Sequence, residues 1–98
     1  MIAVRFLPDA EAELLHEVAY NAKARSEAAI RFQAAVEASI GRAARHPAGG
    51  ASAPGGTRCM LVKVFPFSVV YRASEIELLV VAVAPHRRRP GYWLQRVV

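Results

Sequence analysis

The residues best suited to chemistry lie in the last segment of the chain, APHRRRPGYWLQRVV. Three consecutive arginines, Arg87 to Arg89, follow His86 and precede the aromatic pair Tyr92 and Trp93. Arginine binds phosphates and carboxylates through paired hydrogen bonds, and aromatic rings stack on bases or fill a partner's pocket. Histidine also transfers protons near neutral pH. The segment therefore predicts contact with an anionic partner.

The same residues have a simpler interpretation. A small core needs its largest side chain, so we expect Trp93 to fold back and cap the sheet. For His86 the simpler role is an ordinary hydrogen bond at the end of a strand. Pro90 and Gly91 suit a chain reversal, which would return Tyr92 and Trp93 to the sheet or its groove.

Further cations lie on the predicted strands. Side chains alternate between the faces of a sheet, so we expect Lys63, Ser68 and Arg72, or a subset, to share one face. With the C-terminal arginines they would form a concave cationic surface that suits nucleic-acid phosphates or an acidic peptide. The alternative is solvated charges that keep edge strands from aggregating. The candidate binding residues are Arg58, Lys63, Arg72, His86, Arg87, Arg88, Arg89, Tyr92, Trp93 and Arg96.

Charge is distributed unevenly along the chain. Residues 1–37 contain four Lys or Arg and six Asp or Glu, a net charge of −2. Residues 38–98 contain nine bases and two acids, a net charge of +7, and no acid follows Glu77. Such a positive field favours an anionic partner: nucleic acid, an acidic protein segment or a membrane surface.

Several kinds of site lack support in the sequence. The Gly-Gly pairs at 49–50 and 55–56 are not followed by the helix and the Lys-Ser/Thr pair of a phosphate-binding loop. The three histidines are far apart in sequence, and only one cysteine exists, so we expect no metal and no cofactor. Cys59 cannot form an internal disulfide, and we expect it to be a small buried hydrophobic residue.

The helices and strands that position these residues are predicted from the spacing of apolar residues and from the positions of Pro and Gly. We expect the order β-α-α-β-β-β in one domain, residues 1–98, with short connections that favour antiparallel pairing of the last three strands. The first helix opens at Pro8, with an apolar stripe that excludes Glu11, Glu13 and Glu17, and Ser26 is the expected N-cap of the second. The expected strands are 2–6, 58–64, 67–72 and 76–84, and residues 47–57 are expected to be a flexible loop.

Two expectations concern burial and location. The strand at 76–84 is apolar at nearly every position, so we expect it to be central and covered on both faces. The N-terminal sequence MIAVRFLPDAE brings acids early, so we expect no secretory signal and a cytoplasmic protein.

Taken in order, these segments resemble the RelE/ParE superfamily of bacterial toxins, the toxic halves of type II toxin–antitoxin modules. The resemblance covers nearly the whole chain, with FLPDAEAELLHEVAY in the first helix and FQAAVEASI in the second. Arg58 opens the strand after the loop. The turn and strand FPFSVVYR, which includes Tyr71, precede the ending IELLVVAVAPHRRRPGYW.

The resemblance implies a fold, a partner and one of two activities. The family fold is an antiparallel sheet with a helical hairpin packed on one face. A cognate antitoxin neutralises each toxin by wrapping an extended or helical segment around it. RelE-like members cut mRNA in the ribosomal A site without a metal, and ParE-like members inhibit DNA gyrase.

One position separates the two activities. RelE-like toxins typically carry an arginine just after the first aromatic residue of the strand that follows the central turn, where this chain has Ser68. A ribonuclease without a metal needs cations to stabilise the pentacovalent phosphate, and the candidates here are Arg58, Lys63, Arg87 and Tyr92. We therefore favour gyrase inhibition. The alternatives are the ribonuclease and a degenerate member that binds an antitoxin without being toxic.

Overall fold

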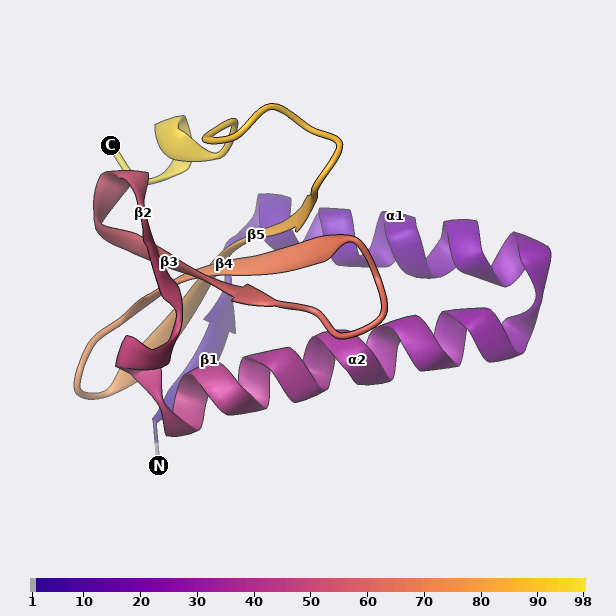
Figure 1. Ribbon diagram of the computed structural model, residues 1–98, viewed down its shortest axis with the longest axis horizontal. Coiled ribbons are helices and arrows are strands. Elements are labelled where there is room, and N and C mark those ends of the chain that lie inside the picture. The colour runs from indigo at the N-terminus through magenta and orange to yellow at the C-terminus, as the bar shows by residue number, and fades with distance from the viewer. Residues whose placement is uncertain (1) are drawn as a thin grey trace.

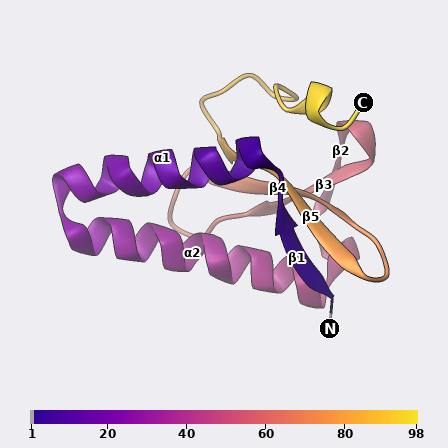
Figure 2. The same cartoon turned by 180° about the vertical axis from the view of Figure 1, so that it is seen from behind.

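The chain folds into a five-stranded sheet with two long helices on one face, as the computed structural model of residues 2–98 shows (Figure 1). The same arrangement seen from behind places β1 beside β5 (Figure 2). The predicted α+β class is confirmed. The elements are β1 (Ala3–Phe6), α1 (Pro8–Ala24), α2 (Ser26–Arg45), β2 (Ala51–Ala53), β3 (Thr57–Leu61), β4 (Phe67–Ala73) and β5 (Glu77–Pro85), with single 3₁₀ turns at Pro47–Gly49, Pro54–Gly56 and Leu94–Arg96.

The sheet is mixed, with strand order β1-β5-β4-β3-β2. The pairs β3–β4 and β4–β5 are antiparallel, as the short connections predicted. β1 pairs parallel with β5, where Ala3 lies opposite Glu77, so the sheet is not wholly antiparallel. Parallel neighbours need a long crossover, and here all the elements between β1 and β5 supply it.

The two helices bury an apolar face against the sheet. Apolar residues that recur at helical spacing along α2 are buried: Ala29, Phe32, Val36, Ile40 and Ala43. Phe32 meets the rings of Phe65 and Phe67 edge-on, with centroids 5.2 Å and 5.0 Å away. Ser26 is the first residue of α2 and makes no capping hydrogen bond, because the chain turns one residue earlier, at the extended Arg25.

The glycine-rich segment 47–57 is ordered, contrary to the expected flexible loop. Its centre forms β2, which pairs antiparallel with β3 through Ala51 and Cys59. The phenol of the fully buried Tyr71 donates to the Pro47 carbonyl over 2.7 Å and accepts from the Gly50 N–H over 3.2 Å. Long-range hydrogen bonds therefore order a segment whose composition is typical of a loop.

The strand predicted over residues 58–64 is shorter than expected. β3 ends at Leu61, and the Val62 N–H donates to the Phe67 carbonyl across the bend. Val64 has φ 76°, a left-handed conformation that does not continue a strand. Lys63 therefore lies in the bend after β3 and not on the sheet.

The second sheet face is covered by residues 86–98, which we call the C-terminal strap. Trp93 is only 6% exposed and packs with Val70, Val81 and Ala82, so its predicted role as a cap is confirmed. β5 is covered on both faces, as predicted. The concave cationic surface expected on this face does not form as predicted, because the strap packs there and Lys63 lies beyond the end of β3. Within residues 2–98, no helix has both the length and the apolarity needed to cross a membrane.

Candidate functional site

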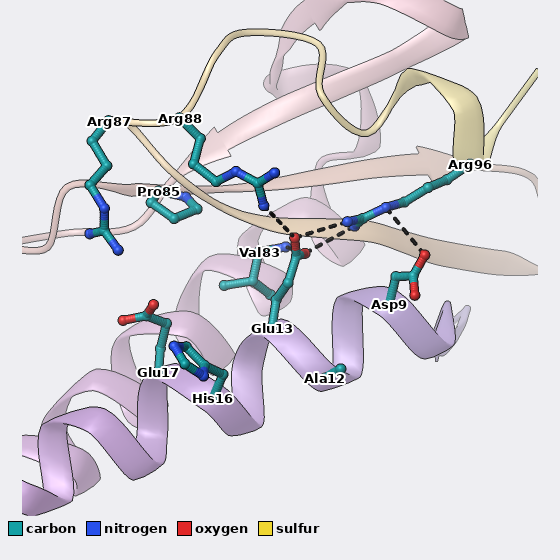
Figure 3. A pocket seen from close by; sticks show the side chains of 10 residues that line it. All are labelled: Asp9, Ala12, Glu13, His16, Glu17, Val83, Pro85, Arg87, Arg88 and Arg96. Atoms are coloured by element: carbon teal, nitrogen blue, oxygen red, sulfur yellow. Dashed lines mark hydrogen bonds and ion pairs between the residues drawn. The ribbon is translucent and has the colours of Figure 1, made fainter.

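The strap is attached to α1 through the carboxylate of Glu13. This group accepts hydrogen bonds from the Val83 backbone N–H at 3.1 Å and from the Tyr92 hydroxyl at 2.7 Å. The guanidinium of Arg96 adds two more, each 3.0 Å long, and Arg88 approaches to 3.9 Å (Figure 3). One carboxylate on a helix thus joins β5 and two parts of the strap.

Around Glu13 lies a cleft of about 500 Å³ with acids on one wall and bases on the other. The helix contributes Asp9, Glu13 and Glu17, and the end of the chain contributes arginines across from them (Figure 3). Asp9 lies 3.6 Å from the Nε of Arg96. The arginines that line the cleft are Arg87, Arg88 and Arg96.

The expectation that Glu13 and Glu17 lie outside the packed face of α1 is wrong. Glu17 is 8% exposed, and the Glu13 side chain is 17% exposed. A signal for this was present in the sequence. Asp9, Glu13 and Glu17 recur every four residues and so form one acidic stripe on the helix. Every charged residue after Glu77 is a base. An acidic helix face and a basic end of one chain are complementary.

A second, smaller pocket lies between the strap and the sheet. It encloses about 250 Å³ and is lined by Ser68, His86, Arg89 and Trp93, among others. The Ser68 hydroxyl and the His86 Nε2 are 2.8 Å apart, which is the ordinary hydrogen bond predicted for this histidine. Cys59 also lines this pocket. It is half-buried, and that burial raises the pKa of its thiol.

The remaining predicted cations do not join these two sites. Arg58 donates to the Gly50 carbonyl over 2.8 Å, and Arg72 donates to the Gly55 carbonyl over 2.8 Å. Both line a third depression. Lys63 lines a fourth with Arg42. Ser68 lines the pocket under the strap, and Arg72 donates to the Val97 carbonyl of the strap, so both lie on the strap side of the sheet. Lys63 lines neither of these places.

Metal-ion chemistry has no obvious site in the part of the chain that the structure describes. Among residues 2–98, no three His, Cys, Asp or Glu side chains lie close enough together to hold a metal ion. The arginines and aromatic rings of the strap are groups suited to binding anionic groups.

The position of Tyr92 predicts a loss of stability in alkali. Burial raises the pKa of the Tyr92 phenol far above its usual range, and the hydrogen bond to Glu13 raises it further. The folded chain therefore holds this proton more tightly than the unfolded chain. Ionisation of Tyr92 should leave the free energy of unfolding unchanged below pH about 10 and lower it above that pH, by at most about 1.4 kcal/mol per pH unit.

Urea unfolding of the wild type and Tyr92→Phe, measured at several pH values from about 8 to about 11, checks this prediction. The Phe variant should be less stable at pH 8 but lose less stability toward pH 11. Parallel pH profiles for the two proteins would contradict it.

Comparison with known proteins places this architecture in a family. The family model for the ParE toxin of the type II toxin–antitoxin system parDE matches residues 4–90. The chain belongs to the ParE toxin family. The family implies a cognate antitoxin as partner. A comparison with curated protein sequences finds no match.

A solved structure supports the fold of this ParE-family chain. The chromosomal ParDE toxin–antitoxin system from P. aeruginosa includes a chain with 18% identity and a TM-score of 0.72. The match covers 87% of this chain and 96% of that chain. The family match ends at residue 90, so Tyr92, Trp93 and Arg96 of the strap lie beyond it.

Proposed function

We propose that this ParE-family toxin inhibits DNA gyrase and that its cognate antitoxin neutralises it. The observation that carries the choice of target is the separation of the four residues a ribonuclease would use. Arg58 and Lys63 line two different depressions. Arg87 lines the cleft against α1, and Tyr92 lines the pocket under the strap. Arg58, Lys63 and Arg87 thus line three different depressions, and the Tyr92 hydroxyl is engaged by Glu13, so the four groups are not arranged around one site where they could stabilise a phosphate together.

The environment of Ser68 also supports this choice. Where a RelE-like toxin would present an arginine, this chain has a buried serine hydrogen-bonded to His86. The side chain lies under the strap and lacks a positive charge. It therefore offers no stabilisation to a developing phosphorane.

The arginines of the strap that form no ion pair within residues 2–98 favour contact with an anionic group of the antitoxin or the target. Arg96 is paired with Glu13, and Arg88 lies between Glu13 and the ring of Tyr92. Arg87 and Arg89 are exposed, and neither forms an ion pair within residues 2–98. We propose that these two arginines contact the partner, because unpaired arginines at a rim steer association and form charge-assisted hydrogen bonds.

Two assays with the purified chain test the target. We expect it to inhibit DNA supercoiling by gyrase and to leave mRNA on translating ribosomes intact. Cleavage of ribosome-bound mRNA with normal supercoiling would overturn the proposal in favour of the ribonuclease. A chain that neither inhibits gyrase nor cleaves mRNA, but still binds the antitoxin encoded by a neighbouring gene, would be a degenerate member of the family.

The double variant Arg87→Ala/Arg89→Ala tests the contact surface. We expect it to lower gyrase inhibition at least about tenfold, since each lost charge-assisted hydrogen bond contributes about 1.5–3 kcal/mol. The matched control is Arg25→Ala/Arg31→Ala, which removes two exposed arginines from the helical hairpin. Equal inhibition by the two variants would contradict the assignment.

A further inference from the structure

β1 forms one edge of the sheet and carries backbone groups that no other strand within residues 2–98 uses. Its one neighbour in this part of the chain is β5, where the Ala3 N–H donates to the Ile76 carbonyl over 3.0 Å. Backbone groups of successive strand residues point to opposite sides, so the N–H and C=O groups of Val4 and Phe6 point away from β5. In Figure 2 β1 lies in front of the other strands, and no other element crosses it. β1 can therefore pair with one further strand.

The side chains at this edge are apolar or neutralised. Val4 is 44% exposed, and Ile76, which directly precedes β5, is 79% exposed. The one charged residue of β1, Arg5, donates two hydrogen bonds to the Glu77 carboxylate, with lengths of 2.9 Å and 3.1 Å. Natural edge strands are commonly protected by a free charge that prevents pairing with another chain. β1 lacks this protection, because its charge is already paired.

The opposite edge of the sheet differs from β1. It is formed by β2, which has only three residues, Ala51–Ala53, and no large apolar side chain. Turns that contain Pro47 and Pro54 flank it on both sides. Short strands and nearby prolines are typical protection against edge-to-edge pairing. Of the two edges, β1 is therefore the one open to pairing.

The sequence of β1 is complementary to itself in an antiparallel register centred on Val4. In this register Val4 lies opposite Val4 of a second copy, and Arg5 lies opposite the second copy's Ala3. The other neighbour of that alanine is the second copy's Glu77, because Ala3 and Glu77 are paired within each chain. The small alanine leaves room for Arg5 of one copy to approach Glu77 of the other. Opposite charges thus meet across the pair, and no like charges face each other on the two β1 strands.

A groove beside β1 adds apolar surface to this edge. It has a volume of about 430 Å³ and lies between β1 and the end of α2. Its lining residues are Ile2, Val4, Gly41, Ala44 and Arg45. Side chains that lie opposite each other in an antiparallel pair point to the same face of the sheet, so Val4 of a second copy would lie beside this groove. Pairing would therefore remove apolar surface from water as well as satisfy the free backbone groups.

We propose that the free toxin forms a two-fold symmetric dimer in which β1 pairs antiparallel with β1 of a second copy. The two five-stranded sheets become one continuous sheet, with Val4 on the two-fold axis. About six backbone hydrogen bonds join the copies, through Ile2, Val4 and Phe6 of each. The inference goes beyond the proposed function and does not depend on which target the toxin inhibits.

Sedimentation equilibrium of the purified intact chain tests the dimer. We expect a monomer–dimer equilibrium with a Kd of about 10–100 μM, since two short strands form a small interface, over a concentration range of about 1 to 500 μM. A monomer throughout this range would overturn the proposal and would leave the edge for a strand of another protein. A dimer is supporting evidence only if the variants below place it at β1.

Val4→Lys tests the position of the interface. It places two like charges opposite each other on the axis, so we expect the Kd to rise at least about tenfold. The matched control is Val64→Lys, at a valine that is 87% exposed in the bend after β3, which β5 and β4 separate from β1. The control should dimerise as the wild type does. Equal dimerisation of Val4→Lys and the wild type would rule out β1 as the interface.

A cross-linking experiment keeps the test valid even where Val4→Lys impairs folding. Val4→Cys is made in a Cys59→Ala background, so the chain has one cysteine. Because the proposed axis places residue 4 opposite itself, oxidised glutathione should convert this variant to a disulfide-linked dimer. Val64→Cys in the same background should remain mostly monomeric. Equal yields of linked dimer from the two variants would contradict the proposed register.

Discussion

Gly50→Ala is expected to lower the free energy of unfolding by about 3 kcal/mol, because there is no space for a methyl group. A Cβ at this position would lie 2.6 Å from the Tyr71 hydroxyl and 2.8 Å from the Cys59 carbonyl oxygen. Gly50 has φ −77° and ψ 154°, which alanine adopts without strain, so the cost is steric. Relief by movement of Tyr71 would break its hydrogen bonds to Pro47 and Gly50.

The adjacent glycine provides a matched control. A Cβ on Gly49 would come no closer than 3.4 Å, to the Cβ of His46, so Gly49→Ala should cost less than about 1 kcal/mol. Urea unfolding of both variants and the wild type measures the difference. Similar stabilities for the two variants would show that the segment 47–57 adapts, and that its contact with Tyr71 does not order it.

The second large effect is expected for Glu13→Gln, which should lower the free energy of unfolding by about 2–3 kcal/mol. The carboxylate accepts from Val83, Tyr92 and Arg96 at once, and it carries the charge that balances Arg96. Glutamine keeps one acceptor oxygen and places an NH₂ group among donors. The Arg96 side chain is 18% exposed, so water compensates only in part.

The same substitution should loosen the strap more than the helices. Trp93 reports on this directly, because it is the sole tryptophan and is the strap residue that packs on the sheet. We expect a red-shifted emission and faster amide hydrogen exchange in residues 86–98, with exchange in α2 unchanged apart from the global loss of stability. Glu11→Gln, an exposed position on the same helix, is the control and should behave as the wild type. Unchanged exchange in the strap would show that apolar packing alone holds it.

Local pattern was enough to predict the helices and the two central strands. The apolar spacing of α2 required one buried face, and the nearly continuous apolar run of β5 required cover on both sides. Pro8 and Pro47 mark a helix start and a helix end through backbone geometry alone. These features depend on residues close together in sequence, so they can be predicted without the fold. The order of these elements along the chain also indicated the resemblance to the toxin family.

What only the tertiary structure decided are the contacts between residues far apart in the chain. Segment 47–57 is ordered because Tyr71 and Arg58 reach its backbone, although its own composition is typical of a loop. Glu13 became the attachment point of the strap because the fold brings residues 83, 92 and 96 to one carboxylate. The second sheet face is covered for the same reason, because the fold brings the strap close enough to pack on it without a partner. The sequence determined the apolar faces of α2 and β5 and where the charges lie along the chain, while the closure of the chain onto itself determined which charges are paired and which remain free.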